Sequence, residues 1–245
     1  MFYQTLQRSQ SFQNIPQRKF QEKIKSIIQG CQACSIKKES DPTCEKCSIL
    51  SIAYNRYFTS NIPVEYWDLS MEKDFRGHDV LLKKYYESVA DIKKFYIDGT
   101  SLFFAGNHGC GKTMISTSIL KKAAQKNYTC LYTTLSDSVA ALTQAPDDEK
   151  YIARKELLTV DFLVIDEFDN RFMSTEHSIE LFGRTLENIF RTRSQNKMPT
   201  IMCTNSPNIV EAFSGAIKQS IDSLLKGYVK VVPILGSDFR KEKGK

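Results

Sequence analysis

From residue 79 onward, the pattern of apolar and polar positions alternates between helical and strand-like segments. Apolar residues recur at helical spacing in some segments, and short, mostly apolar runs lie between them. This order is typical of an α/β domain with a mainly parallel sheet. The predicted helices are Val80–Phe95, Met114–Lys126, Asp137–Ala145 and Thr175–Arg193, the predicted strands are Ser101–Ala105, Tyr128–Leu135, Asp161–Ile165 and Thr200–Thr204, and Pro146–Glu149 is predicted to be an acidic exposed loop.

The first part of the chain has a different pattern. Apolar residues at helical spacing predict a helix over Lys19–Gln29, which Gly30 ends, and a second helix over Ile49–Tyr57. The chain then breaks at Asn61-Ile62-Pro63. We therefore expect three parts: a small N-terminal module at 1–60, an extended connector at 61–78, and the α/β domain at 79–245.

Composition narrows the class of protein. The 245 residues are 41% hydrophobic and 25% charged, which excludes a wholly disordered, collagenous or coiled-coil chain. The longest apolar runs fall short of the ~18–20 residues that a membrane span needs. The first twenty residues are polar and rich in glutamine, without the apolar core of a signal peptide. We expect a folded, soluble protein that stays in the cytoplasm.

The net charge of +6 is concentrated at the two ends. Residues 1–30 carry five cationic side chains against one acidic, and residues 226–245 carry six against two. Two interpretations stay open: the ends are solvated tails, or they contact nucleic acid or an acidic partner.

Four of the seven cysteines form two CxxC pairs, Cys31 with Cys34 and Cys44 with Cys47. Two such pairs can direct four thiolates at one ion, so the spacing predicts a tetrahedral zinc site. The zinc is expected to be structural, because four thiolates leave no open position for a substrate. The alternatives are reduced cysteines without a metal, an iron–sulfur cluster or a redox pair.

Residues 106–113 read GNHGCGKT and match G-x-x-x-x-G-K-[ST] in full, between a predicted strand and a predicted helix. Such a loop turns backbone N–H groups toward phosphate oxygens, and the next helix presents its positive end to the same anion. Lys112 adds a positive charge for the β- and γ-phosphates, and Thr113 a hydroxyl ligand for Mg²⁺. The predicted ATP-binding residues of this segment are Gly106, Asn107, His108, Gly109, Cys110, Gly111, Lys112, Thr113 and Met114, with His108 and Cys110 at variable positions of the motif.

An acidic pair follows the third predicted strand. Four apolar residues, Phe162–Ile165, lead into Asp166 and Glu167, which is the Walker B arrangement. Asp166 is predicted to hold Mg²⁺ directly or through water, and Glu167 to polarise the attacking water as general base. Taken alone, such a pair can also be a solvated strand end.

Asn205 follows the fourth predicted strand. If that strand lies between the first and the third, Asn205 can hydrogen-bond the lytic water or the γ-phosphate and act as a catalytic sensor. The alternative is a turn residue before Ser206-Pro207, since asparagine commonly forms turns.

These motifs in this order resemble AAA+ ATPases of the additional-strand class, P-loop proteins with a parallel sheet. Over residues 60–240 the order of elements is similar to the DnaC/IstB branch, which contains bacterial and phage helicase loaders and transposition helper ATPases. The resemblance rests on GNHGCGKT, on FLVIDE at 162–167, on the run from Arg193 through Pro199 to Asn205, on Asn61-Ile62-Pro63 and on Ser237-Asp238-Phe239-Arg240.

The resemblance implies several partners and roles. In such loaders a zinc-binding module ahead of the ATPase core grips a replicative hexameric helicase, and the ATPase assembles into a ring or filament on single-stranded DNA. The resemblance also implies that Arg240 senses the γ-phosphate, although it can equally be one more basic tail residue. Family arginines in the helix before the last strand are missing here, because Lys218–Leu224 contains none. Lys218, Lys226 or a partner's arginine can substitute, and we expect slow hydrolysis by the chain alone.

The sequence therefore predicts an ATP-dependent helicase loader that uses ATP, Mg²⁺ and Zn²⁺. A transposition helper that binds duplex DNA and recruits a transposase is the alternative on the same fold. A small-molecule kinase is a third hypothesis, but a kinase would leave the cysteine module unexplained.

Overall fold

The computed structural model describes residues 9–31, 44–168, 176–205 and 215–234. Its centre is a five-stranded sheet in which every neighbouring pair of strands is parallel. The strand order is β2-β3-β4-β1-β5, so β4 lies between β1 and β3. The strands are β1 (Ser101–Gly106), β2 (Cys130–Thr134), β3 (Phe162–Asp166), β4 (Thr200–Thr204) and β5 (Val229–Ile234).

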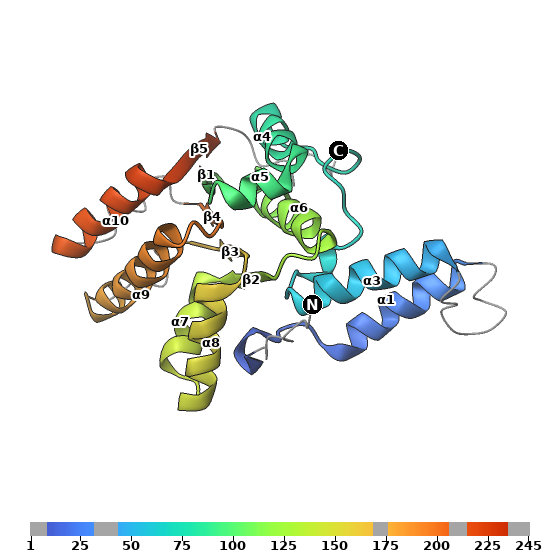
Figure 1. Cartoon of the computed structure of the whole chain (residues 1–245), viewed down its shortest axis with the longest axis horizontal. Coiled ribbons are helices and arrows are strands. Elements are labelled where there is room, and N and C mark those ends of the chain that lie inside the picture. The colour runs from blue at the N-terminus through green and yellow to red at the C-terminus, as the bar shows by residue number, and fades with distance from the viewer. Residues whose placement is uncertain (1–8, 32–43, 169–175, 206–214, 235–245) are drawn as a thin grey trace.

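Helices cover both faces of this sheet (Figure 1). Side chains of a strand alternate between the faces, so Leu102 and Phe104 pack into one apolar cluster while Phe103 and Ala105 pack into the other. The first face is covered by α3 (Glu45–Thr59), α4 (Asp79–Ala90), α5 (Ile92–Ile97) and α6 (Lys112–Gln125). The second face is covered by α7 (Leu135–Thr143), α8 (Asp147–Thr159), α9 (Glu176–Gln195) and α10 (Gly215–Tyr228). This two-sided burial explains why the strands are almost entirely apolar.

Before the sheet, α1 (Gln17–Gln29) and α3 lie side by side as a helical hairpin that extends away from the sheet (Figure 1). Phe20 of α1 stacks on Phe58 of α3 with ring centroids 4.8 Å apart. The end of α3 packs near α6, and Trp67 is buried there with its ring nitrogen donating to the carbonyl of Ile62 over 2.7 Å. The hairpin is thereby joined to the first face of the sheet through aromatic packing.

A short 3-10 turn, η1 (Gln10–Phe12), brings the segment before α1 onto the other face. Phe12 is buried in the cluster that α7 and α8 form. The backbone N–H of Ser9 donates to Glu156 over 2.9 Å, and its hydroxyl donates to Glu149 over 2.8 Å. The start of the described chain therefore contacts both faces of the α/β domain.

The predicted strands and most predicted helices are confirmed to within a few residues, but three expectations are wrong. The helix predicted over Val80–Phe95 is two helices, because Asp91 ends α4 and accepts a hydrogen bond from the N–H of Lys94 at the start of α5. The expected acidic loop is the first turn of α8, where carboxylates are stabilised by the positive helix end. The connector is not extended throughout, because it contains the 3-10 turn η2 (Val64–Tyr66).

Candidate functional site

The glycine-rich loop connects the end of β1 to the start of α6. Gly111 lies directly before α6 with φ of 95°, in the left-handed region that favours glycine. A Cβ atom on Gly111 would lie 2.5 Å from Cε2 of Phe75, and one on Gly106 would lie 2.5 Å from the carbonyl oxygen of Ile234. Side chains at these two positions would therefore displace the neighbouring strand and connector.

Lys112, the first residue of α6, points back into this loop. Its Nζ donates to the carbonyls of Gly106 over 2.9 Å and Asn107 over 2.6 Å, and the side chain is buried. A buried ammonium needs such acceptors, because burial without partners is costly. The loop therefore encloses a positive charge beside the positive end of α6.

The carboxyl ends of β3 and β4 carry the predicted polar side chains to the same edge of the sheet. Asp166 ends β3 and is buried, with Oδ1 accepting from the N–H of Glu167 over 2.7 Å and Oδ2 accepting from the hydroxyl of Tyr132 over 2.9 Å. Burial, together with Asp166, raises the pKa of Tyr132 well above its usual range, so this hydroxyl is the proton donor. Glu167 is exposed and has φ of 50°, and Asn205 directly follows β4.

A cavity of about 600 Å³ joins these groups. It brings together the predicted residues His108, Gly109, Gly111, Lys112, Thr113, Met114, Asp166, Glu167 and Asn205. Gly106, Asn107 and Cys110 belong to the loop but do not line the cavity. The arrangement offers backbone N–H groups and a cation for an anion, and a carboxylate and a hydroxyl for a divalent cation.

Another wall of the cavity comes from the segment at 61–78, which the sequence predicts to be an extended connector. Its lining residues are Tyr66, Leu69, Asp74, Phe75, Arg76 and Gly77. This wall is held in place by Lys121 of α6, which donates to the carbonyls of Tyr66, over 2.7 Å, and Leu69. Lys121 is buried, and burial lowers its pKa to about 8. No motif in the connector indicated this role, since the contacts join residues more than fifty positions apart.

The arginines of α9 do not line the cavity. Arg184 and Arg191 pair with Glu180 and Glu187 of the same helix, at 2.5 and 2.8 Å. Arg193 is completely buried at the opposite end of the strands, among backbone carbonyls. Arg193 therefore contributes to the packing of the fold and does not contact the cavity.

The helix α10 precedes β5, the last described strand. In α10, Lys226 pairs with Asp222 over 2.6 Å. Gln219 and Ser223 are exposed at the positions where the resemblance leads one to expect arginines. Arg240 lies outside the described residues, and its predicted role stays a prediction.

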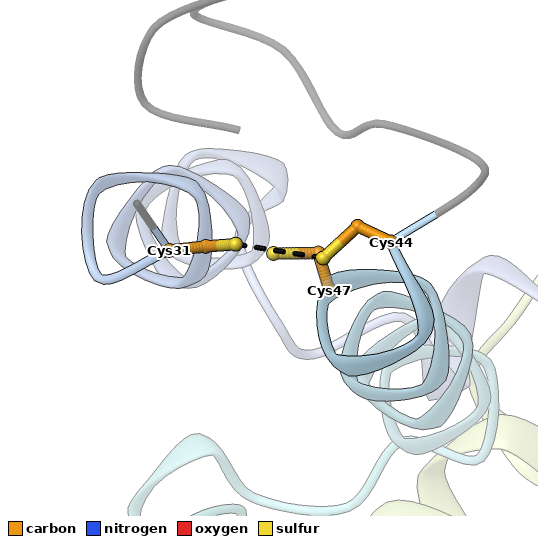
Figure 2. A group of neighbouring side chains, drawn as sticks. All are labelled: Cys31, Cys44 and Cys47. Carbon is orange, nitrogen blue, oxygen red and sulfur yellow. Dashed lines mark hydrogen bonds between the residues drawn. The ribbon is translucent and has the colours of Figure 1, made fainter. Parts of the chain in front are cut away.

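A second candidate site lies at the tip of the helical hairpin (Figure 2). Cys31 follows α1, and Cys44 and Cys47 lie at the start of α3. Their sulfur atoms all lie within 4.8 Å of one another, and those of Cys31 and Cys44 are 3.5 Å apart. Thiolates bound to one tetrahedral zinc lie roughly 3.8 Å apart, given Zn–S bonds of about 2.3 Å. The three cysteines therefore fit a shared ion, and Cys34 lies outside the described residues.

The parallel sheet with β4 inserted between β1 and β3, and the glycine-rich loop after β1, define an α/β protein with the AAA+ fold. The family model described as IstB-like ATP binding protein matches residues 69–207. Because this match spans more than half of the chain, the protein belongs to the IstB-like ATP-binding family. No curated protein matches the chain in sequence.

Solved structures of DnaI, DnaC and DnaA share the fold. A structure of DnaI is 17% identical, with a TM-score of 0.55, over 72% of this chain and 93% of that one. A structure of the DnaC helicase loader is 18% identical, with a TM-score of 0.55, over 70% of this chain and 99% of that one. AMPPCP-bound DnaA from Aquifex aeolicus is 22% identical, with a TM-score of 0.55, over 74% of this chain and 55% of that one. Among the described residues, no helix combines the length and the apolar character needed to cross a membrane.

Proposed function

We propose that this protein binds and hydrolyses ATP with Mg²⁺ and uses that cycle to load a replicative hexameric helicase onto single-stranded DNA. The observation that carries the proposal is the convergence of Lys112, Asp166 and Asn205 on one cavity, in a chain that also carries a separate helical hairpin. In this proposal the cavity binds and hydrolyses ATP, and the hairpin contacts the helicase.

In the proposed ATP complex, residues 106–113 and Met114 surround the phosphates. Backbone N–H groups of the loop and the first turn of α6 donate to phosphate oxygens. The ammonium of Lys112, now bonded to two loop carbonyls, exchanges one of them for an oxygen of the β- or γ-phosphate. Arg240 is proposed to contact the γ-phosphate from the end of the chain.

The hydroxyl of Thr113 and the carboxylate of Asp166 are proposed to hold Mg²⁺, and both line the cavity. When bound, the ion supplies charge neutralisation on the β- and γ-phosphates. Glu167 is exposed to the cavity and accepts a proton from the attacking water as general base. Asn205 orients that water or the γ-phosphate through its amide.

The hairpin is proposed to be the helicase contact. Ile49 and Ile52 lie one helical turn apart on α3 and are 65% and 48% exposed, which is unusual for large apolar side chains. Exposed apolar residues on a separate helical element suit docking to another protein. Cys31, Cys34, Cys44 and Cys47 are proposed to hold a structural Zn²⁺ that fixes the ends of both helices.

Single-stranded DNA is proposed to bind the ATPase in a self-associated ring or filament, helped by the basic ends of the chain. The charge supports this part of the proposal, since the net charge is +6 and is concentrated at the ends. Domain bounds of 1–60, 61–78 and 79–245 remain the proposed division of the chain.

The test is capture of the hydrolysis-deficient Glu167→Gln variant from its native cell in the presence of ATP. We expect a hexameric helicase to be retained, and Ile52→Glu to reduce that retention at least about tenfold. Val80→Glu is the matched control, because Val80 is 46% exposed on α4, which lies apart from the far end of the hairpin (Figure 1). If the Glu167→Gln protein retains as much helicase with the added Ile52→Glu change as without it, the proposed docking face is contradicted.

A transposition helper is the second candidate function, and the family model favours it because its description is IstB-like. In that case the same capture retains a transposase instead of a helicase, and duplex DNA competes better than single-stranded DNA for the ATP-bound protein. The two outcomes separate the functions without changing the assignment of the cavity.

A further inference from the structure

Tyr132 on β2 contacts the functional site from a strand that carries none of its motifs. Its hydroxyl donates to Asp166 Oδ2 over 2.9 Å, and both residues are buried. In the sheet register Tyr132 lies opposite Val164, and Thr134 lies opposite Asp166. Side chains two positions apart point to the same face, so the long tyrosine ring reaches diagonally along the sheet to the end of β3.

The hydrogen bond leaves Asp166 in a fixed orientation. Oδ1 accepts from the N–H of Glu167, and Oδ2 accepts from Tyr132, so each carboxylate oxygen has one donor among the residues that the structure describes. Each oxygen keeps acceptor capacity, because an ionised carboxylate has about four lone-pair sites. Asp166 also lines the cavity, so this remaining capacity is available on the cavity side.

Tyr132 is itself held from outside the sheet. Among the described strands β2 is an edge, and its outer side is covered by the residues that follow α3. The N–H of Tyr132 donates to the carbonyl of Ser60 over 2.8 Å, and its carbonyl accepts from Asn61 Nδ2 over 3.0 Å. Ser60 and Asn61 are buried, so these contacts fix the backbone from which the tyrosine ring projects.

We propose that Tyr132 is a positioning residue that orients Asp166 to hold the divalent cation of the nucleotide complex. This inference rests on the proposed ATP function and adds a residue to it. Groups that orient a metal ligand typically change metal affinity or activity 10–100-fold when removed. The tyrosine touches neither nucleotide nor cation in this proposal, and it acts through the carboxylate alone.

The test is the Mg²⁺ dependence of binding of a fluorescent, non-hydrolysable ATP analogue to the full chain. Tyr132→Phe keeps the ring and removes the hydroxyl, so we expect about a tenfold higher Mg²⁺ concentration for half-maximal enhancement of binding. Analogue affinity in excess EDTA should stay unchanged, which also reports that the cavity is folded. Tyr85→Phe is the matched control, because Tyr85 is buried on α4 and its hydroxyl donates to the carboxylate of Glu72.

The outcomes separate this inference from the function on which it rests. A native chain whose analogue binding ignores Mg²⁺ overturns the proposed cation site itself. A native chain that responds to Mg²⁺, with an unchanged response in Tyr132→Phe or an equal shift in Tyr85→Phe, overturns the role of Tyr132 only. If Tyr132→Phe does not fold, Asn61→Gly tests the same point, because it frees the backbone of Tyr132. We then expect the Mg²⁺ concentration for half-maximal enhancement to rise about two- to threefold, and no rise would contradict the inference.

Discussion

Arg193 on α9 donates from Nε to Oγ1 of Thr200, the first residue of β4, over 2.8 Å, and this arginine has no exposed surface. Its other guanidinium nitrogens donate to the carbonyls of Val160 over 2.9 Å and Pro199 over 2.7 Å. Burial lowers the pKa of Arg193 to about 9, and the charge of the Asp161 carboxylate offsets this effect only in part. One planar side chain thus joins the ends of α8 and α9 to the start of β4.

Arg193→Leu should therefore lower the free energy of unfolding by about 3–5 kcal/mol, because several buried carbonyls lose their donor. Arg193→Lys should recover little, since an ammonium cannot reproduce the guanidinium fork. Nucleotide affinity of the folded fraction should not change, because Arg193 does not line the cavity. Chemical denaturation measures the loss.

The matched control is Arg191→Leu, since Arg191 is exposed and, within the described part of the chain, pairs with Glu187 and Ser220. A surface pair of this kind contributes about 0–1 kcal/mol. Similar losses for the two variants would show that the buried hydrogen bonds of Arg193 stabilise the fold no more than a surface pair does.

The nucleotide site gives the second prediction. Lys112→Ala should weaken ATP binding at least about tenfold, because charge-assisted hydrogen bonds contribute about 1.5–3 kcal/mol each. Glu167→Gln should keep ATP binding and lose hydrolysis, because it removes only the proton acceptor. Equilibrium binding and phosphate release measure the two effects, and equal ATP affinity for the native chain and Lys112→Ala would exclude the cavity as the ATP site.

Much of this site could be predicted because its parts are local in sequence. The loop at 106–113, Asp166 and Asn205 all lie at strand ends, and a parallel sheet brings strand ends to one edge. Tyr132 and the connector wall could not be predicted, because each depends on contacts between distant positions. The hydroxyl of Tyr132 meets a carboxylate 34 positions away, and nothing near it in sequence indicates that partner.

The fold shows the same division between local and distant signals. Apolar runs predicted the strands closely, since their burial on both faces excludes polar residues. The acidic residues at 147–149 predict an exposed loop, because charged side chains prefer solvent. In the structure they form the first turn of α8, where their charges stabilise the helix through its dipole. Arg193 looked like part of a family motif, and only the packed structure gives the reason why it is buried.

The cysteine cluster gives the third prediction. The purified protein should contain about one zinc ion per chain, and Cys44→Ser should release it and loosen the hairpin while ATP binding persists, because structural zinc stabilises its own module. Metal analysis and proteolysis of the hairpin measure both effects. Cys130→Ser is the control, since Cys130 is buried in β2 far from the cluster in sequence. A zinc-free chain with a protease-resistant hairpin would contradict this prediction.

Lys121 gives a prediction for the pH dependence of stability. Burial lowers its pKa to about 8 in the folded protein, whereas the unfolded chain keeps the ordinary value of 10.5. Between these values the unfolded state binds more protons, so this group makes the free energy of unfolding rise with pH. Below pH 8 both states are protonated, and its contribution is flat and unfavourable.

The native chain should therefore gain stability relative to Lys121→Met by about 1 kcal/mol per pH unit between pH 8 and 10, within the limit of about 1.36 kcal/mol per pH unit for one titrating group. Denaturant unfolding at several pH values measures the difference. Lys122→Met is the matched control, because Lys122 is the exposed neighbour on α6. A difference that does not change with pH would show that Lys121 keeps its ordinary pKa when buried.

The final prediction concerns the rate of ATP hydrolysis. Gln219 and Ser223 are exposed on α10 at the positions where the resemblance leads one to expect arginines, and no arginine lies between Arg193 and Arg240 in the sequence. An arginine from a neighbouring molecule can raise such rates by ~10³–10⁵. Because α10 offers none, we expect slow turnover by the isolated chain, and faster turnover when single-stranded DNA or the helicase is added. Steady-state phosphate release under the three conditions measures this. DNA binding should also weaken steeply with salt, as counterion release requires. A maximal rate for the chain alone, unaffected by Arg240→Ala, would show that the missing arginines do not limit hydrolysis.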